Sequence, residues 1–194
     1  RFVGDYLVSA GVPRDKVSAI PTGIDFSRYQ VSPDGGTLRR ELGLPEDAVL
    51  VGTVAILRKK KGHAELIAAI PAVLARHPQT HFVIAGDGPM QATLETDLRS
   101  QGLEGTVHML GLRRDVTNIL QSLDLFVLPT HQEALGTAFI EAAAMGVPAI
   151  GTAVDGVPEV VADGETGLLV PPENPTALAA AIITLLDQPE RRRE

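Results

Sequence analysis

Cysteine is absent from all 194 residues, so the chain can form neither disulfides nor thiolate metal sites. A cysteine-free chain suits a reducing compartment. Basic residues are in the minority, since 17 lysines and arginines stand against 24 acidic residues for a formal net charge of -7. This balance argues against a nucleic-acid scaffold. No apolar run reaches the roughly 18 residues of a membrane-spanning helix.

Several catalytic signatures are missing as well. None of the five histidines has the spacing of a metal site, because Pro78 separates His77 from His81. No Gly-x-Ser-x-Gly nucleophile elbow is present. Residues 86–89 read Gly-Asp-Gly-Pro, which is only part of a dinucleotide fingerprint and is not a Walker loop. We therefore expect a site that works without a metal ion or a resident cofactor.

Apolar residues make up 44% of the chain, enough for a sizeable core. Short apolar runs alternate with helical patterns. Two runs, 49–55 and 82–85, are almost continuously apolar, as in strands that are covered on both faces of a parallel sheet. We expect strands at residues 17–20, 49–55, 81–85, 106–110, 123–128, 148–151 and 167–170.

Helical patterns fill the intervals between these strands. They lie over residues 1–11, 66–74, 90–98, 116–123, 136–145 and 178–186. Alternation of strands and helices predicts an α/β fold, a Rossmann-like open parallel sheet with helices on both faces. Ligands of such sheets bind at the carboxyl ends of the strands. We expect a segment of a longer protein, in which residues 1–37 form an interdomain junction and residues 38–194 a binding domain.

The densest group of candidate residues runs from Glu133 to Glu141, after the strand expected at 125–128. A helix that begins near Gly136 would offer free N–H groups and a positive dipole end to a phosphate. Thr137 can add a hydroxyl donor, and Glu141 can accept hydrogen bonds from the two hydroxyls of a ribose. Glu133 could reach a second polar group. On spacing alone, a buried helix with two surface glutamates is an equally good interpretation.

A basic loop and a glycine turn follow two other expected strands. Residues 58–61 read Arg-Lys-Lys-Lys directly after the run 49–55. Four cations at the carboxyl end of a strand can neutralise a diphosphate, and the alternative is a solubilising loop. Gly86 and Gly88 follow the run 81–85, where they predict a tight turn that a ligand can approach closely.

Taken together, these segments resemble the C-terminal half of a GT-B glycosyltransferase. The most similar family is glycosyltransferase family 4 (group 1), whose members are retaining enzymes that use nucleotide-sugar donors. The resemblance covers nearly the whole chain. The segments that match the family in order and spacing are Ile20–Asp25, Val83–Pro89, Asp124–Pro129, Glu133–Pro148 and Gly164–Val170.

The resemblance implies a role for each candidate residue. Glu141 would hold the ribose hydroxyls of the donor, and Glu133 would contact the donor sugar. Gly86 and Gly88 would belong to the donor-binding turn. The diphosphate would lie against Lys61 and three backbone amides at the start of the helix. These amides are those of Leu135, Gly136 and Thr137.

One departure from the family pattern concerns an arginine. The family often has arginine where this chain has Ile56. Arg58 lies two residues further, on the same side of an extended chain, and is the expected replacement. Arg58 and Lys61 would stabilise the leaving diphosphate as the sugar–phosphate bond breaks. With Glu133 they form the candidate catalytic set.

The implied activity is transfer of a hexose from a nucleotide-diphosphate sugar with retention of configuration, without a metal or a cofactor. The acceptor, a sugar, lipid or small molecule, would be bound mainly by an N-terminal domain outside this chain. We therefore expect this chain alone to be inactive. Polysaccharide synthesis in the cytoplasm, at the inner face of the membrane, is a common setting and would allow peripheral membrane association. No nucleic-acid partner is expected.

Two other interpretations stay open. One is a noncatalytic nucleotide-binding module, and the other is a different GT-B enzyme such as a sugar-nucleotide epimerase or a phosphorylase. Lys61, Glu133 and Glu141 are all present, which argues against the first. The order of the motifs favours family 4 over the second.

Overall fold

The computed structural model describes residues 2–20, 23–32, 35–188 and 190. Six strands form one sheet in the order β3-β2-β1-β4-β5-β6, and every pairing within it is parallel. The predicted parallel sheet is therefore confirmed. Its strands are β1 (Val49–Val54), β2 (Thr80–Ala85), β3 (Val107–Gly111), β4 (Leu125–Leu128), β5 (Ala149–Thr152) and β6 (Gly167–Val170).

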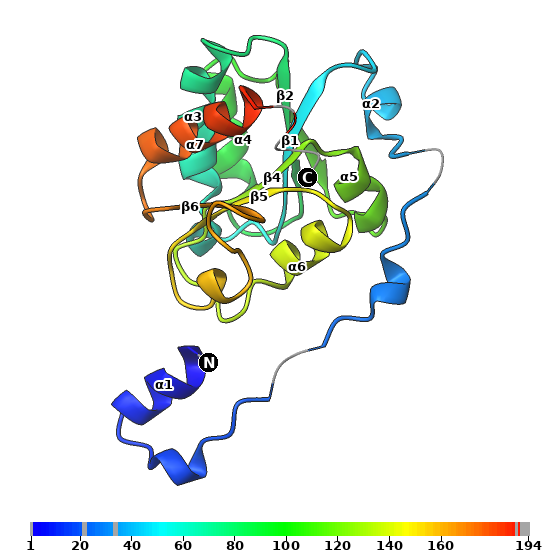
Figure 1. Cartoon of the computed structure of the whole chain (residues 1–194). Helices are drawn as coiled ribbons and strands as arrows, with labels where there is room; N and C mark the ends of the chain where they lie inside the picture. The colour runs from blue at the N-terminus through cyan, green and yellow to red at the C-terminus, as the bar shows by residue number, and fades with distance from the viewer. Residues whose placement is uncertain (1, 21–22, 33–34, 189, 191–194) are drawn as a thin grey trace.

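Helices cover both faces of the sheet, as predicted (Figure 1). Along β2, Phe82 and Ile84 join one buried cluster, whereas Val83 and Ala85 join the other. This alternation explains why the strand is apolar at nearly every position. The first face carries α3 (His63–Leu74), α4 (Gln91–Ser100) and α7 (Pro175–Leu186). The second face carries α2 (Leu38–Glu41), α5 (Val116–Ser122) and α6 (Thr137–Ala144).

Residues 2–20 and 23–32 form no part of the sheet and extend beyond it, with α1 at their far end (Figure 1). They contain α1 (Phe2–Ser9), which confirms the predicted helix within the described residues, and the short 3-10 turns Arg14–Lys16 and Phe26–Arg28. The strand predicted at residues 17–20 is wrong, because Val17–Ile20 forms no strand. An apolar run makes a strand only where another strand can pair with it, and the sheet does not reach this segment.

The strand order places the candidate site. From β1 the chain moves outward through β2 and β3, then returns to the other side of β1 for β4, β5 and β6. The order therefore reverses between β1 and β4. The carboxyl ends of two strands at such a switch point flank a crevice in which α/β proteins bind ligands. The loop after β1 holds the basic residues, and the loop after β4 holds Glu133.

Candidate functional site

The basic loop and the glutamate loop meet at this switch point. The Lys61 ammonium forms an ion pair with the Glu133 carboxylate, although 72 residues separate them in the sequence. Each side chain is only 16% exposed. Lys61 ends the 3-10 turn Lys59–Lys61, which leads directly into α3. Two of the predicted site residues are therefore in direct contact.

Backbone contacts fix the two loops to each other. The carbonyl oxygen of Lys60 accepts a hydrogen bond from the His131 amide at 2.7 Å and one from Thr130 Oγ1 at 2.9 Å. Gly62 is left-handed at φ 72°, and a Cβ there would lie 1.9 Å from the Pro129 carbonyl oxygen. Only glycine permits this approach. The Lys61–Glu133 pair therefore rests on a rigid junction of two loops.

A third loop, after β5, holds the backbone of Glu133 on both sides. The Glu133 amide donates to Asp155 Oδ2 at 3.0 Å, and its carbonyl accepts from the Gly156 amide at 2.9 Å. Asp155 adopts φ 48°, an uncommon conformation for a residue other than glycine. Asp155 was not predicted from the sequence, where the Asp-Gly pair is its only local signal.

Helix α6 begins beside this pair, as predicted. Gly136 is its N-cap residue, with φ 79°, and no described side chain caps the helix. The first amides of a helix lack partners within it, so those near Thr137 are available to a ligand. A Cβ on Gly136 would lie 2.8 Å from the Phe139 ring and 3.3 Å from Glu133 Cγ. Glycine here therefore leaves room for the side chain of Glu133.

Glu141 lies one helical turn into α6 and is half-buried. Its partner is Tyr29, from the segment that precedes the sheet domain. Burial and a hydrogen bond from its phenol to the Glu141 carboxylate raise the pKa of Tyr29 above its usual value. Tyr29 also packs against the second buried cluster. No local pattern identified Tyr29 from the sequence, because the contact spans more than a hundred residues.

Gly86 and Gly88 lie against the loop that follows β1. A Cβ on Gly86 would come within 2.0 Å of the Ala55 carbonyl oxygen, and one on Gly88 within 2.6 Å of the Leu57 carbonyl oxygen. The Leu57 amide also donates to the Asp87 carbonyl at 2.7 Å. Close loop packing thus explains both glycines, and contact of either with a ligand stays a prediction.

The extended path expected between Ile56 and Arg58 is wrong, whereas the role of Arg58 at the diphosphate stays a prediction. Ile56 lines a hollow of about 200 Å³ at the carboxyl ends of β1 and β2, whereas Arg58 lines a separate hollow of about 130 Å³ with His63 and Met90. The chain is not extended between them, because the Arg58 amide donates to the Ile56 carbonyl at 2.8 Å. This tight turn sends the two side chains to different sides.

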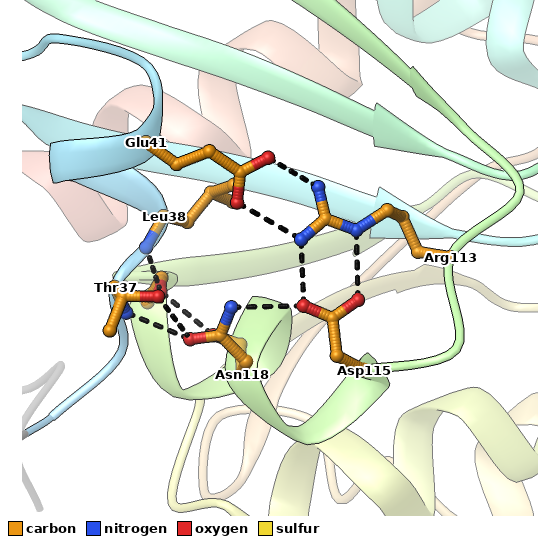
Figure 2. Close-up of polar contacts among 7 residues, drawn as sticks. Thr37, Leu38, Glu41, Arg113, Asp115 and Asn118 are labelled. Atoms are coloured by element: carbon orange, nitrogen blue, oxygen red, sulfur yellow. Dashed lines mark hydrogen bonds and ion pairs between the residues drawn. The ribbon is translucent and has the colours of Figure 1, made fainter.

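Arg113, which helps to line the larger hollow, is the centre of a polar network (Figure 2). The Arg113 guanidinium donates two hydrogen bonds to Glu41 and two to Asp115, at 2.5–3.0 Å. These bonds hold the pKa of Asp115 far below its usual range and raise that of Arg113. Asn118 extends the network by accepting from the Thr37 amide at 2.8 Å. The network ties α2 to the start of α5, and it was not predicted from the sequence.

Two searches of the described part of the chain gave negative results. Among residues 2–20, 23–32, 35–188 and 190, no group of three or more histidine, aspartate or glutamate side chains is arranged to hold a metal ion. No helix among those residues is long and apolar enough to cross a membrane.

Comparison with known proteins identifies the family. The model of the family described as Glycosyl transferases group 1 matches residues 35–194. The chain therefore belongs to the group 1 glycosyl transferases, which confirms the resemblance at this level. A D-inositol 3-phosphate glycosyltransferase of Corynebacterium efficiens is 34% identical over 188 residues, covering 92% of this chain and 44% of the relative. The chain spans about half the length of the curated relatives it matches.

Solved structures agree with the fold. The crystal structure of Anabaena Alr3699/HepE in complex with UDP-glucose matches with a TM-score of 0.88 and 27% identity, over 98% of this chain and 53% of that chain. The C-terminal domain of a glycosyl transferase group 1 family protein (LpcC) from Francisella tularensis matches with a TM-score of 0.78 and 23% identity. That match covers 88% of this chain and 91% of the solved domain, and it supports the fold alone.

Proposed function

We propose that this chain is the donor-binding half of a retaining glycosyltransferase that moves a sugar from a nucleotide-diphosphate sugar to an acceptor. The observation that carries the proposal is the convergence of Lys61, Glu133 and the uncapped start of α6 at the switch point of the sheet. A relative of similar fold has been solved with UDP-glucose. In this division, residues 1–37 join the domains and residues 38–194 bind the donor.

The diphosphate lies between Lys61 and the start of α6 in this proposal. The ammonium is a cation, and the amides of Leu135, Gly136 and Thr137 add the positive end of a helix dipole. When the bond between the anomeric carbon and the phosphate oxygen breaks, negative charge builds up on the leaving diphosphate. Fixed positive groups stabilise that charge more than they stabilise the bound donor, and this difference accelerates the step.

The two glutamates orient the rest of the donor. Glu141 accepts hydrogen bonds from the ribose hydroxyls, one turn along α6 from the diphosphate. Glu133 accepts from a hydroxyl of the sugar, and its backbone is held by Asp155 and Gly156. A hydroxyl of the acceptor, which is a sugar, lipid or small molecule, bonds to the anomeric carbon from the face of the leaving group, and its proton passes to the departing diphosphate. Attack from this face retains the anomeric configuration. The acceptor is bound by the part of the protein that lies outside this chain.

Calorimetry on the full-length protein tests the proposal. Replacing Lys61 by alanine should weaken binding of a nucleoside diphosphate by roughly 1.5–3 kcal/mol, the scale of a hydrogen bond to a charged group. Lys59→Ala is the matched control, because Lys59 lies in the same turn and is exposed. Equal affinities for the two variants would remove Lys61 from the site. The 194-residue chain alone should bind nucleotide and fail to transfer sugar, since it lacks the acceptor half.

A further inference from the structure

The Lys61–Glu133 ion pair sets a condition on what can bind beside it. Both side chains are largely removed from water, and a carboxylate left in such a place without a partner is strongly destabilised. Lys61 is the one cationic partner that Glu133 has among the described residues. A ligand that draws the Lys61 ammonium away from Glu133 must therefore supply the carboxylate with a new hydrogen-bond donor, or it must bear the cost of leaving the carboxylate unpaired.

Glu133 cannot escape this cost by moving away. Its amide and carbonyl are both hydrogen-bonded to the loop after β5, through Asp155 and Gly156. Its side-chain stem passes 3.3 Å from where a Cβ on Gly136 would be. The carboxylate can turn about its own bonds, but it stays beside the start of α6, where the proposed function places the end of the diphosphate.

From this arrangement we infer that Glu133 is a specificity-determining residue, which makes the site prefer a nucleotide-diphosphate sugar over the free nucleoside diphosphate. The inference rests on the proposed function. The hydroxyls of a donor sugar can replace the ammonium of Lys61 as hydrogen-bond donors to Glu133. A free nucleoside diphosphate has no such hydroxyls at its terminal phosphate, so it would compete with Glu133 for the Lys61 ammonium and offer the carboxylate no donor in exchange.

Charge adds to this preference. The terminal phosphate of a free nucleoside diphosphate is a monoester-like group with a second pKa of about 6, so it carries nearly one additional negative charge at neutral pH. The same phosphate linked to a sugar cannot ionise a second time. Glu133 repels the additional charge, and a repulsive group of this kind is an effective way to reject a competing ligand. The preference would hasten release of the diphosphate product after each transfer.

The test measures a ratio of two affinities on the full-length protein by calorimetry. The probes are UDP and UDP-glucose, followed by GDP and GDP-mannose, and the measured quantity is the dissociation constant of the diphosphate divided by that of its sugar form. Glu133→Gln should tighten binding of the free diphosphate and lower the ratio by about tenfold, the scale of one charged hydrogen bond. Glu133→Asp keeps the charge and should keep most of the preference.

Glu65→Gln is the matched control, because it removes the same charge near the same loops. Glu65 pairs with His131 Nε2 at 3.0 Å and leaves Lys61–Glu133 in place, so the ratio should stay within about threefold of the wild-type value. Because both ligands are measured on one protein, partial damage to the fold cancels in the ratio. An unchanged ratio in Glu133→Gln, beside a wild type that binds the probes, would overturn the inference alone. Failure of the wild type to bind any probe would overturn the proposed function as well.

Discussion

The sheet domain and the segment of residues 2–32 both carry large apolar side chains, but only the sheet domain buries them. Phe82, Phe126 and Phe139 are completely enclosed. In the segment, α1 and both 3-10 turns have no buried residue, and Ile20 is 87% exposed. The apolar content of a stretch therefore does not decide its structure by itself. An apolar stretch also needs a surface to pack against, and within the described chain little such surface contacts the segment.

The segment touches the sheet domain at α5, where Ser32 exchanges two hydrogen bonds with Gln121, and also at the candidate site. Tyr29 reaches Glu141 on α6, and the Phe2 amide donates to Glu159 Oε1 at 2.6 Å. Between α1 and the loop before α6 lies a hollow of about 560 Å³ that Leu7 and Leu135 help to line. The segment is thus poorly packed as a structural element, yet it borders the proposed donor site. This fits a junction between two domains.

The largest expected effect is a difference between the two regions in how much a lost phenylalanine lowers the free energy of unfolding. Phe126→Ala should lower the free energy of unfolding by about 3–5 kcal/mol, the range for a buried aromatic residue, because Phe126 packs edge-on against Phe139 at 5.5 Å between ring centres. Phe26→Ala, in the exposed segment, should change it by less than about 0.5 kcal/mol. Urea unfolding of the 194-residue chain measures both. Similar losses would mean that the segment is part of the cooperative unit.

Acid should act on the sheet domain through His63. Burial, with the charge of Lys61 nearby, lowers the pKa of His63 from 6.5 to about 4. The unfolded chain therefore binds more protons than the folded chain between these two pH values, and stability falls as the pH drops from 6.5 towards 4. The loss should reach about 2–3 kcal/mol. His63→Leu should flatten this part of the stability profile, and an identical slope in both proteins would refute the assignment.

Two glycines with a left-handed backbone, one in each region, allow the packing of the two regions to be compared directly. Gly62→Ala should cost about 2–3 kcal/mol, because backbone strain is joined by a clash with the Pro129 carbonyl. Gly11 has φ 96°, and nothing lies near a Cβ added there. Gly11→Ala should therefore cost only the local backbone strain, about 1 kcal/mol, and should leave unfolding of the sheet domain unchanged. Thermal unfolding of both variants checks the order. Equal shifts would show that loop packing at Gly62 is looser than described.

The smallest expected effect concerns the contribution of the segment to the site. Tyr29→Phe removes the hydroxyl that donates to Glu141, and it should change nucleotide affinity by about 0.5–1.5 kcal/mol, the net value of one hydrogen bond. Tyr6→Phe is the control, since Tyr6 is exposed on α1. Calorimetry on the full-length protein distinguishes them. The same affinity in both variants would mean that Tyr29 only packs against the core.

The sheet could be predicted from the sequence because its inner strands β1, β2, β4 and β5 are buried on both faces. Strands that are buried in this way have apolar residues at nearly every position, as in β1 and β2, and such runs can be recognised in the sequence. Residues 17–20 gave the same local signal without a neighbouring strand, and the prediction failed there. Pairing is a property of the whole fold, which a short window does not contain.

The candidate site also contains some residues that could be predicted from the sequence and others that could not. Lys61, Glu133 and Gly136 could be proposed because each lies at the junction of a strand and a helix, where a parallel sheet binds its ligands. Asp155, Tyr29 and the contact of Arg113 with Glu41 could not, because each depends on a partner far away in the sequence. The extended path predicted from Ile56 to Arg58 failed for a local cause, a tight turn at Leu57.

A crystal structure of the full-length protein with a bound nucleotide-diphosphate sugar tests the central claim most directly. The account predicts the diphosphate within about 3 Å of Lys61 Nζ and of an amide at the start of α6, a normal hydrogen-bond distance. It also predicts the ribose on Glu141, and a sugar hydroxyl on Glu133 in place of Lys61. A diphosphate bound elsewhere, with Lys61 still paired to Glu133, would contradict it.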